Sequence, residues 1–371
     1  GFSRQNEEPN GETLWAFEVD TYEGVDLPLK LDLDGAASDS RPVPSAAPVK
    51  PIRTLNEAMR ALSRARTTGK LEAVQDAIAQ SIDSIAIPYD VQSLGPKFST
   101  DREFRQDYFS VRYGGAPKVE AFSDYRALSE NLARRIVVPE WVENKLFHLR
   151  PDKEQSLDDW REQIRRAAAS EQVARDVILT GVDLSDYFHP DAPAVLERLY
   201  NLPNPAIVLT SHFGHRLARS YLTRMTRGKM FVLNMKGKDA NYTWSNPVEA
   251  AMVAMRALGE GRKVFVAPDG PRGTDRADID VSGYKLDVAH GIHTIGYDCR
   301  ANIAWLHVEV HPEGFLPVLD ESGPSYEQGD TKRSYAARVD KYYAGRIESV
   351  LEGDPAQLLV LPGHEYRLRT K

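Results

Sequence analysis

The sequence predicts an α/β fold in which helices flank a mostly parallel central sheet, with a helical region ahead of it. Two observations predict this class. In the second half of the chain, short β-branched runs alternate with segments of helical pattern, as in units whose parallel strands are joined by helices. In the first half, helical patterns dominate after a polar start. With 371 residues, 42% of them hydrophobic, the chain can form one large domain or two ordinary ones.

The chain begins with a polar segment. Residues 1–53 show no regular apolar pattern, and 34–51 is rich in Ala, Ser and Pro. This composition is typical of an extended arm and not of a packed element. We therefore expect an N-terminal arm over 1–53 and an α/β domain over 54–371, with a helical lead-in to about residue 190.

Helical patterns fill the next part of the chain. Apolar residues recur at helical spacing in 55–87, and Thr68-Gly69 predicts a break between two helices. Residues 101–200 are mostly helical in pattern. The mixture of Arg, Glu and Ala in 158–174 indicates an exposed helix, and 193–200 indicates a further short one.

Compact apolar runs then predict the sheet. They are rich in Val, Ile and Phe and are separated by helical segments, with Pro247 suited to the first turn of one helix. The strands are expected at 206–210, 230–233, 263–267 and 303–310, and the later helices at 247–258 and 334–351.

Composition excludes several classes of function. The formal charge is −7, whereas nucleic-acid-binding domains are usually basic. The single cysteine cannot form an internal disulfide. No apolar run approaches the ~20 residues of a membrane helix, and the start has no secretory-signal pattern. We therefore expect a soluble, cytoplasmic protein without nucleic-acid partners or stable membrane insertion.

A histidine follows the first predicted strand, in the sequence Thr-Ser-His-Phe-Gly-His. Reactive groups collect at the carboxyl ends of strands in open α/β sheets, so His212 is a candidate general base. A structural histidine in a strand–helix turn is the alternative. Between Arg198 and Lys238 there are eight basic and no acidic residues, which leaves −15 on the remaining chain. This basic window either attracts anions or is a solvated face whose acidic partners lie elsewhere.

A second motif, Asp-Gly-Pro-Arg-Gly, follows the strand predicted at 263–267. Its glycines and prolines favour a tight turn that a ligand can approach, with Gly273 at its end. Arg272 can hold a phosphate or carboxylate with its forked guanidinium, and Asp269 can bond a substrate hydroxyl or hold the loop. An ordinary surface turn is the alternative.

Taken together, these blocks resemble the lysophospholipid-acyltransferase-like superfamily, most closely the bacterial lipid A late acyltransferases. The resemblance covers about 190–371 and rests on four blocks in order: 207–214, 250–273, 289–310 and 335–367. It implies a glycerolipid-acyltransferase-like fold and a thioester donor on a phosphopantetheine arm, carried by an acyl or peptidyl carrier protein or by coenzyme A. No other bound cofactor is implied.

The resemblance also implies site residues. In that family, a histidine in a His-x4-acid motif deprotonates the acceptor hydroxyl, and His212 matches it. The acid position holds Leu217, and His215 and Arg216 stand where the family has Asn-Trp. A distant carboxylate, Asp269 or Glu249, could orient the imidazole instead. We expect His215, Arg216, Arg272 and Gly273 to contact the substrate or its anionic groups, with Lys236 as a further anion contact.

Other residues suggest no separate chemistry. His290 and His293 lie three apart, and His307, His311 and Cys299 follow, but this spacing fits no standard zinc signature. We therefore expect no metal site. Tyr284-Lys285 could form a wall of the site or an ordinary polar loop.

Three functions follow from these observations. The first is acyl transfer from a carrier-bound or coenzyme A thioester to a soluble or carrier-bound small molecule, as in tailoring steps of secondary metabolism. The second is hydrolysis or rearrangement of a carrier-bound thioester. The third is a non-catalytic module that binds an acyl chain or carrier domain, which the leucine at the acid position would favour.

Overall fold

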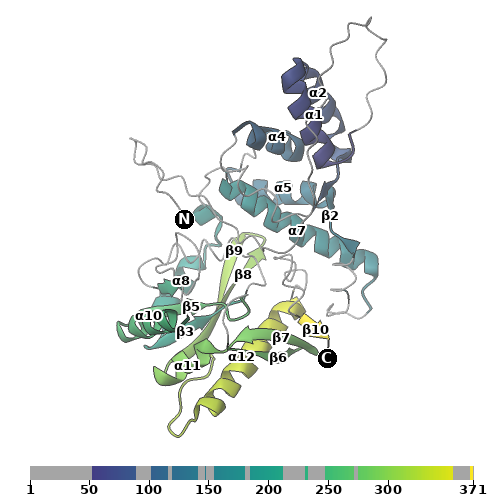
Figure 1. Cartoon of the computed structure of the whole chain (residues 1–371). Helices are drawn as coiled ribbons and strands as arrows, with labels where there is room; N and C mark the ends of the chain where they lie inside the picture. The colour runs from purple at the N-terminus through teal and green to yellow at the C-terminus, as the bar shows by residue number, and fades with distance from the viewer. Residues whose placement is uncertain are drawn as a thin grey trace, which may run out of the picture.

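The computed structural model of the chain describes residues 52–88, 102–115, 119–140, 147, 154–179, 184–211, 230–232, 247–270, 275–353 and 368–370. Within this part the fold is mixed α/β, which confirms the predicted class. Helices gather at one end of the molecule, and the central sheet lies at the other (Figure 1). Of the expected arm over 1–53, all but the last two residues lie outside the described residues.

Two helices separated by a glycine open the described chain, as predicted. The Thr54 hydroxyl accepts from the Glu57 backbone N–H, and the Glu57 carboxylate accepts from the Thr54 N–H, so a capping box starts the first helix. Gly69 ends it with φ of 71°, a backbone conformation that glycine adopts without strain. The helical region contains α1 (Leu55–Thr68), α2 (Leu71–Ser81), α4 (Arg102–Tyr113), α5 (Phe122–Ala133) and α7 (Leu157–Leu179), with the short parallel pair β1 (Ile87–Pro88) and β2 (Ile136–Val137).

The prediction of an exposed helix over 158–174 is wrong. Trp160, Ile164 and Ala168 form a row on α7 at four-residue spacing, and all are at most 1% exposed. The abundant Arg and Glu side chains of α7 obscure this narrow apolar stripe in the sequence. Among its described side chains, the helix α7 is thus buried along most of its length, and the exposed ones are confined to its first half.

A five-stranded mixed sheet forms the centre of the second region. Its order is β4-β5-β3-β8-β9; the pairs β4–β5, β5–β3 and β3–β8 are parallel, and β8–β9 is antiparallel. All four residues of β3 are buried, as expected for a central strand covered on both faces. The strands are β3 (Ala206–Leu209), β4 (Met230–Val232), β5 (Lys263–Val266), β8 (Asn302–His311) and β9 (Gly314–Asp320).

The sequence reading missed a second sheet. The strands β6 (Arg276–Val281) and β7 (Tyr284–Ala289) form an antiparallel hairpin, and β10 (Leu368–Thr370) pairs with β7. Tyr284 and Lys285 therefore lie in a strand and not in a polar loop. Ser282 and Gly283 make the hairpin turn with φ of 46° and 85°, a tight two-residue connection. The strand β9 was missed because Pro317 suggests a loop, although an edge strand tolerates proline.

Helices complete the second region, and its strands β8 and β9 contact the helical region. β8 and β9 extend toward the helical region (Figure 1), where the ring of Phe315 meets those of Phe122 and Tyr125 edge to face at 5.4 and 5.3 Å. None of the described helices is both long and apolar enough to cross a membrane. The remaining helices are the 3₁₀ turn η2 (Leu184–Tyr187), α8 (Ala192–Tyr200), α10 (Pro247–Gly259), α11 (Gly291–Asp298) and α12 (Lys332–Gly353).

Candidate functional site

The carboxyl ends of β3 and β5 lie side by side. The two strands are parallel and pair Leu209 with Val266, and the Thr210 N–H donates to the Val266 carbonyl at 2.9 Å. Both predicted motifs start from this edge of the sheet, since Ser211 precedes His212 and Val266 precedes the Asp-Gly-Pro-Arg-Gly sequence. Ligands of open α/β sheets bind at such an edge. The sheet therefore brings together the starts of two motifs, which are 57 residues apart in the chain.

The Asp269 side chain is fully buried in the turn after β5. The Gly270 N–H donates to the Ala267 carbonyl at 3.2 Å, which closes the turn, and the Ala289 N–H donates to the Pro268 carbonyl at 2.8 Å. A buried carboxylate is costly unless polar or charged groups compensate it, so its burial next to a strand end marks Asp269 as a candidate functional group. Glu249, the other carboxylate considered for orienting His212, is exposed in the first turn of α10.

Arg276 holds this turn against the hairpin, and the sequence reading missed it. Its three guanidinium nitrogens donate to the Asp287 carboxylate at 2.8 Å, the Gly270 carbonyl at 2.8 Å and the Asp287 carbonyl at 2.9 Å. Arginine suits this role because its planar fork fixes several acceptors at once. The alternation of β6, which begins at Arg276, is the signal that could have revealed the hairpin.

Thr210 and Ser211 directly follow β3 at this edge of the sheet, and each is 1% exposed. The Tyr343 hydroxyl, from α12, donates to the Thr210 carbonyl at 3.1 Å. The Tyr343 ring packs edge to face on Trp305 of β8, which is the register partner of Leu209. The end of β3 is thus fixed by α12 as well as by its two neighbouring strands.

A hydrogen-bonded row runs along β8 beyond the end of β3. The Trp305 Nε1–H donates to His307 Nδ1 at 2.8 Å, so the imidazole carries its proton on Nε2 and donates it to Glu309 at 2.9 Å. The bond from His307 lowers the pKa of Glu309, and burial opposes this shift. Both ring nitrogens of His307 are engaged. The row therefore stabilises the sheet edge and leaves no nitrogen of His307 available as a general base.

Most of the predicted site residues lie outside the described residues. These are His212, His215, Arg216, Leu217, Lys236, Arg272 and Gly273. Of the eight basic residues in the window, the structure describes Arg198 alone, which pairs with Glu321 at 2.6 Å. For that residue the interpretation as a solvated face with distant acidic partners is correct.

The histidines set aside for poor metal spacing are regrouped by the fold. His290 and His293 meet Asp340, whereas His311 meets His189 and Glu313. Cys299 joins neither group, and burial raises the pKa of its thiol, with Asp298 adding to the shift. The thiol is therefore a poor nucleophile.

Compared with protein-family models, the chain matches none. A search of curated proteins likewise finds no match.

Proposed function

We propose that the chain is an acyltransferase-like enzyme acting on a thioester bound to a carrier protein or coenzyme A. The acceptor is a soluble or carrier-bound small molecule, as in the tailoring steps of secondary metabolism. The observation that carries the proposal is the shared edge of β3 and β5, with Asp269 buried after one strand and His212 following the other in sequence. The three parallel pairings among β4, β5, β3 and β8 also support the glycerolipid-acyltransferase-like fold that the sequence resemblance implies.

In the proposed reaction, His212 takes a proton from the acceptor hydroxyl or amine. The acceptor attacks the thioester carbonyl, the C–S bond breaks and the thiolate receives a proton. Asp269 is assigned to substrate contact or to holding the loop. Arg272, Gly273, His215, Arg216 and Lys236 are assigned to the substrate or its anionic groups. Because Leu217 cannot orient an imidazole, either a distant carboxylate, a carbonyl or a water orients His212, or the acceptor is an amine that needs less help from a base.

The proposal is tested by incubating the protein with carrier-bound acyl thioesters and a panel of amines and alcohols, with mass spectrometry of the products. His212→Ala should lower the rate by ~10²–10⁴-fold, the usual contribution of a general base. His311→Gln serves as a matched control, because His311 lies at the last position of β8, beyond Trp305, which pairs with Leu209 at the end of β3. If free acid forms when no acceptor is added, the proposed reaction is thioester hydrolysis and not acyl transfer. If the protein binds the carrier tightly without turnover, and His212→Ala does not change that binding, the protein is a binding module and not an enzyme.

The basic window is proposed to meet an acidic carrier domain. Charge attraction between exposed groups is screened over about 8 Å at physiological ionic strength. The KM for a carrier-bound thioester should therefore rise with added salt, while the KM for a short uncharged thioester should not. Equal salt dependence for both donors would contradict the role of the window.

A further inference from the structure

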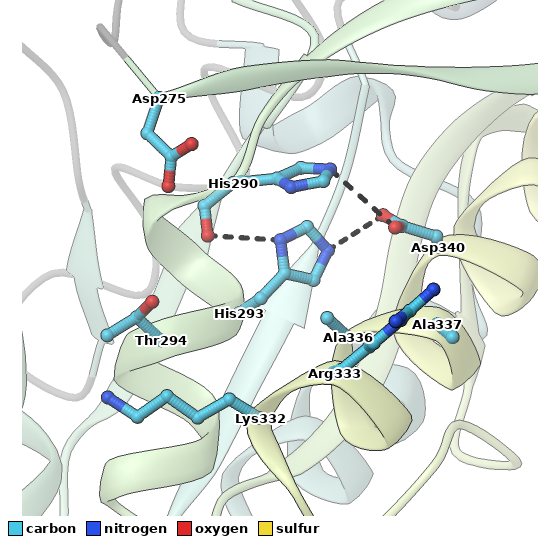
Figure 2. A pocket seen from close by; sticks show the side chains of 9 residues that line it. All are labelled: Asp275, His290, His293, Thr294, Lys332, Arg333, Ala336, Ala337 and Asp340. Carbon is cyan, nitrogen blue, oxygen red and sulfur yellow. Dashed lines mark hydrogen bonds and ion pairs between the residues drawn. The ribbon is translucent and has the colours of Figure 1, made fainter.

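The amino-terminal end of α11 and the middle of α12 bring two histidines and a carboxylate together. His293 Nε2 lies 2.8 Å from Asp340 Oδ1, and His290 Nε2 lies 3.6 Å from Asp340 Oδ2. The two imidazoles meet edge to face with centroids 4.5 Å apart, and both direct a nitrogen toward Asp340 (Figure 2). The ligand atoms all lie within 4.8 Å of one another. Three-residue spacing places both histidines on one face of the helix.

The hydrogen bond of His293 exposes a lone pair. Its Nδ1 lies 3.0 Å from the His290 carbonyl, which can only accept, so Nδ1 carries the proton. In the neutral ring, Nε2 then presents a lone pair toward the Asp340 carboxylate. Metal-ligating histidines usually have this arrangement, with the distal N–H donated to a carbonyl or carboxylate. The His293 side chain is 7% exposed, so it is held in this orientation inside the protein.

Two further polar atoms of the group are buried without a hydrogen-bond partner. They are His290 Nε2 and Asp340 Oδ1, the latter despite its short distance to His293. Leaving buried polar atoms without a hydrogen bond costs free energy. The two imidazole nitrogens are directed at the Asp340 carboxylate, so a cation between them would contact all three side chains.

The group of His189, His311 and Glu313 differs in which ring nitrogen of each histidine carries the proton. His189 Nδ1 accepts from the Asp191 backbone N–H at 3.1 Å, and His311 Nδ1 accepts from the Glu313 N–H at 3.4 Å. Each neutral ring therefore carries its proton on Nε2, and His189 directs Nε2 at Glu313 at 3.3 Å. A metal at Nε2 would have to displace that proton and break the backbone bond. This group is the less suitable of the two for a metal.

The group formed by His290, His293 and Asp340 opens into a cavity of about 380 Å³. The side chains of His290 and Asp340 are 25% and 23% exposed, which gives an ion access from solvent. The ammonium of Lys332, also on the lining, is paired with Asp298 at 3.1 Å, which offsets its charge. Asp275 adds a second carboxylate to the lining, and Arg333 adds a cation.

We propose that His290, His293 and Asp340 form a site for a divalent transition metal, with zinc as the ion that fits best. Two imidazole nitrogens and one carboxylate oxygen are a known ligand set for zinc, and such sites keep a further position for water or substrate. Here the cavity leaves room for that position. The cavity lies beside the start of β6, since the His290 N–H donates to the carbonyl of Asp275, which precedes Arg276, at 2.8 Å.

The test uses protein without a histidine tag, titrated with Co²⁺ and followed by the visible ligand-field bands that appear when Co²⁺ exchanges water for nitrogen ligands. One equivalent should bind, and Zn²⁺ should displace it. His293→Gln and Asp340→Asn should each weaken binding by more than ~100-fold, since even changes to groups behind the ligands cost 10–100-fold. The matched control is His311→Gln, which alters the other group and should leave binding unchanged.

Absence of one-equivalent binding would overturn the proposal, as would binding that survives His293→Gln and Asp340→Asn but is lost in His311→Gln. Circular dichroism of the metal-free variants checks that they fold. If His293→Gln fails to fold, Asp340→Asn, which keeps the side-chain shape, decides the question. The readout is independent of acyl transfer, so failure of the proposed enzyme function would leave this result intact.

Discussion

Two buried polar groups in this molecule are built in opposite ways. In the helical region, Arg112 donates to Asp176 at 2.6 Å and to Gln172 at 2.5 Å, and Tyr113 donates to Asp176 at 2.7 Å. Arg112 and Asp176 are at most 1% exposed. In the second region, His290, His293 and Asp340 form ion pairs beside a cavity. One group is closed off from solvent, and the other opens into the cavity.

The difference separates structural from binding groups. A buried ion pair is stable only where its hydrogen-bond partners compensate the loss of hydration. In the helical region a second arginine extends the network of Arg112 and Asp176. Arg135 uses all three guanidinium nitrogens on the carbonyls of Ile85, Arg112 and Val111. Burial and the Asp176 carboxylate raise the pKa of Tyr113 well above its ordinary value, so its hydroxyl remains a donor. This network is closed to solvent and engages most of its polar atoms internally, whereas the group of His290, His293 and Asp340 lies at a cavity.

The largest effect is expected from the closed network. Asp176→Asn leaves the buried Arg112 charge without its partner and should lower the free energy of unfolding by about 3–5 kcal/mol. Glu162→Gln on the same helix is the control, because its exposed pair with Arg166 should contribute less than ~1 kcal/mol. Urea denaturation measures both. Equal effects would show that burial does not distinguish the two pairs.

A smaller loss is expected from the tie between the hairpin and the turn after β5. Arg276→Ala removes three hydrogen bonds of a partly buried guanidinium and should lower the free energy of unfolding by about 1–3 kcal/mol. If Arg276 positions Asp269, acyl transfer should lose kcat more than it raises KM. Arg276→Lys keeps the charge but not the fork, and full rescue by lysine would contradict the positioning role.

The row on β8 should make a small, pH-dependent contribution. The bond from His307 lowers the folded-state pKa of Glu309 below its ordinary 4.5. The stabilisation is therefore complete above that value and is lost as pH falls through the lowered pKa. Glu309→Gln should remove up to about 1 kcal/mol at pH 7 and flatten the decline of stability in acid. Urea denaturation from pH 7 to pH 3 checks the slope, and an unchanged slope would exclude this pair as its source.

The smallest effect is expected from the open group without metal. Asp340→Asn should change the free energy of unfolding of metal-free protein by less than about 1 kcal/mol, because Asp340 is partly exposed and its ion pairs with His290 and His293 are partly screened by solvent. With Zn²⁺ present, the wild-type melting temperature should rise and that of the variant should not. A loss as large as that of Asp176→Asn would make the open group a structural one.

Local patterns predicted much of the fold. Four of the five strands of the central sheet were located because each is a short run rich in Val, Ile or Phe, and the break at Gly69 was located because glycine tolerates positive φ. The β6–β7 hairpin was missed although its Ser-Gly turn and alternation are local signals. The buried face of α7 was missed because charged residues on its other face dominate the composition. Of the predicted site, the structure tests the placement of Asp269 and shows it buried at the end of β5.

The sequence by itself determined the α/β class, four strands of the central sheet and the fact that the two motifs each follow a strand, because these depend on residues close together in the chain. Only the tertiary structure decided which distant groups meet. Arg112 reaches Asp176 across 64 residues, and His293 meets Asp340 across 47. Helix and strand packing selects such pairs, and no local periodicity encodes them. The group of His290, His293 and Asp340 could therefore be recognised only once α11 lay against α12.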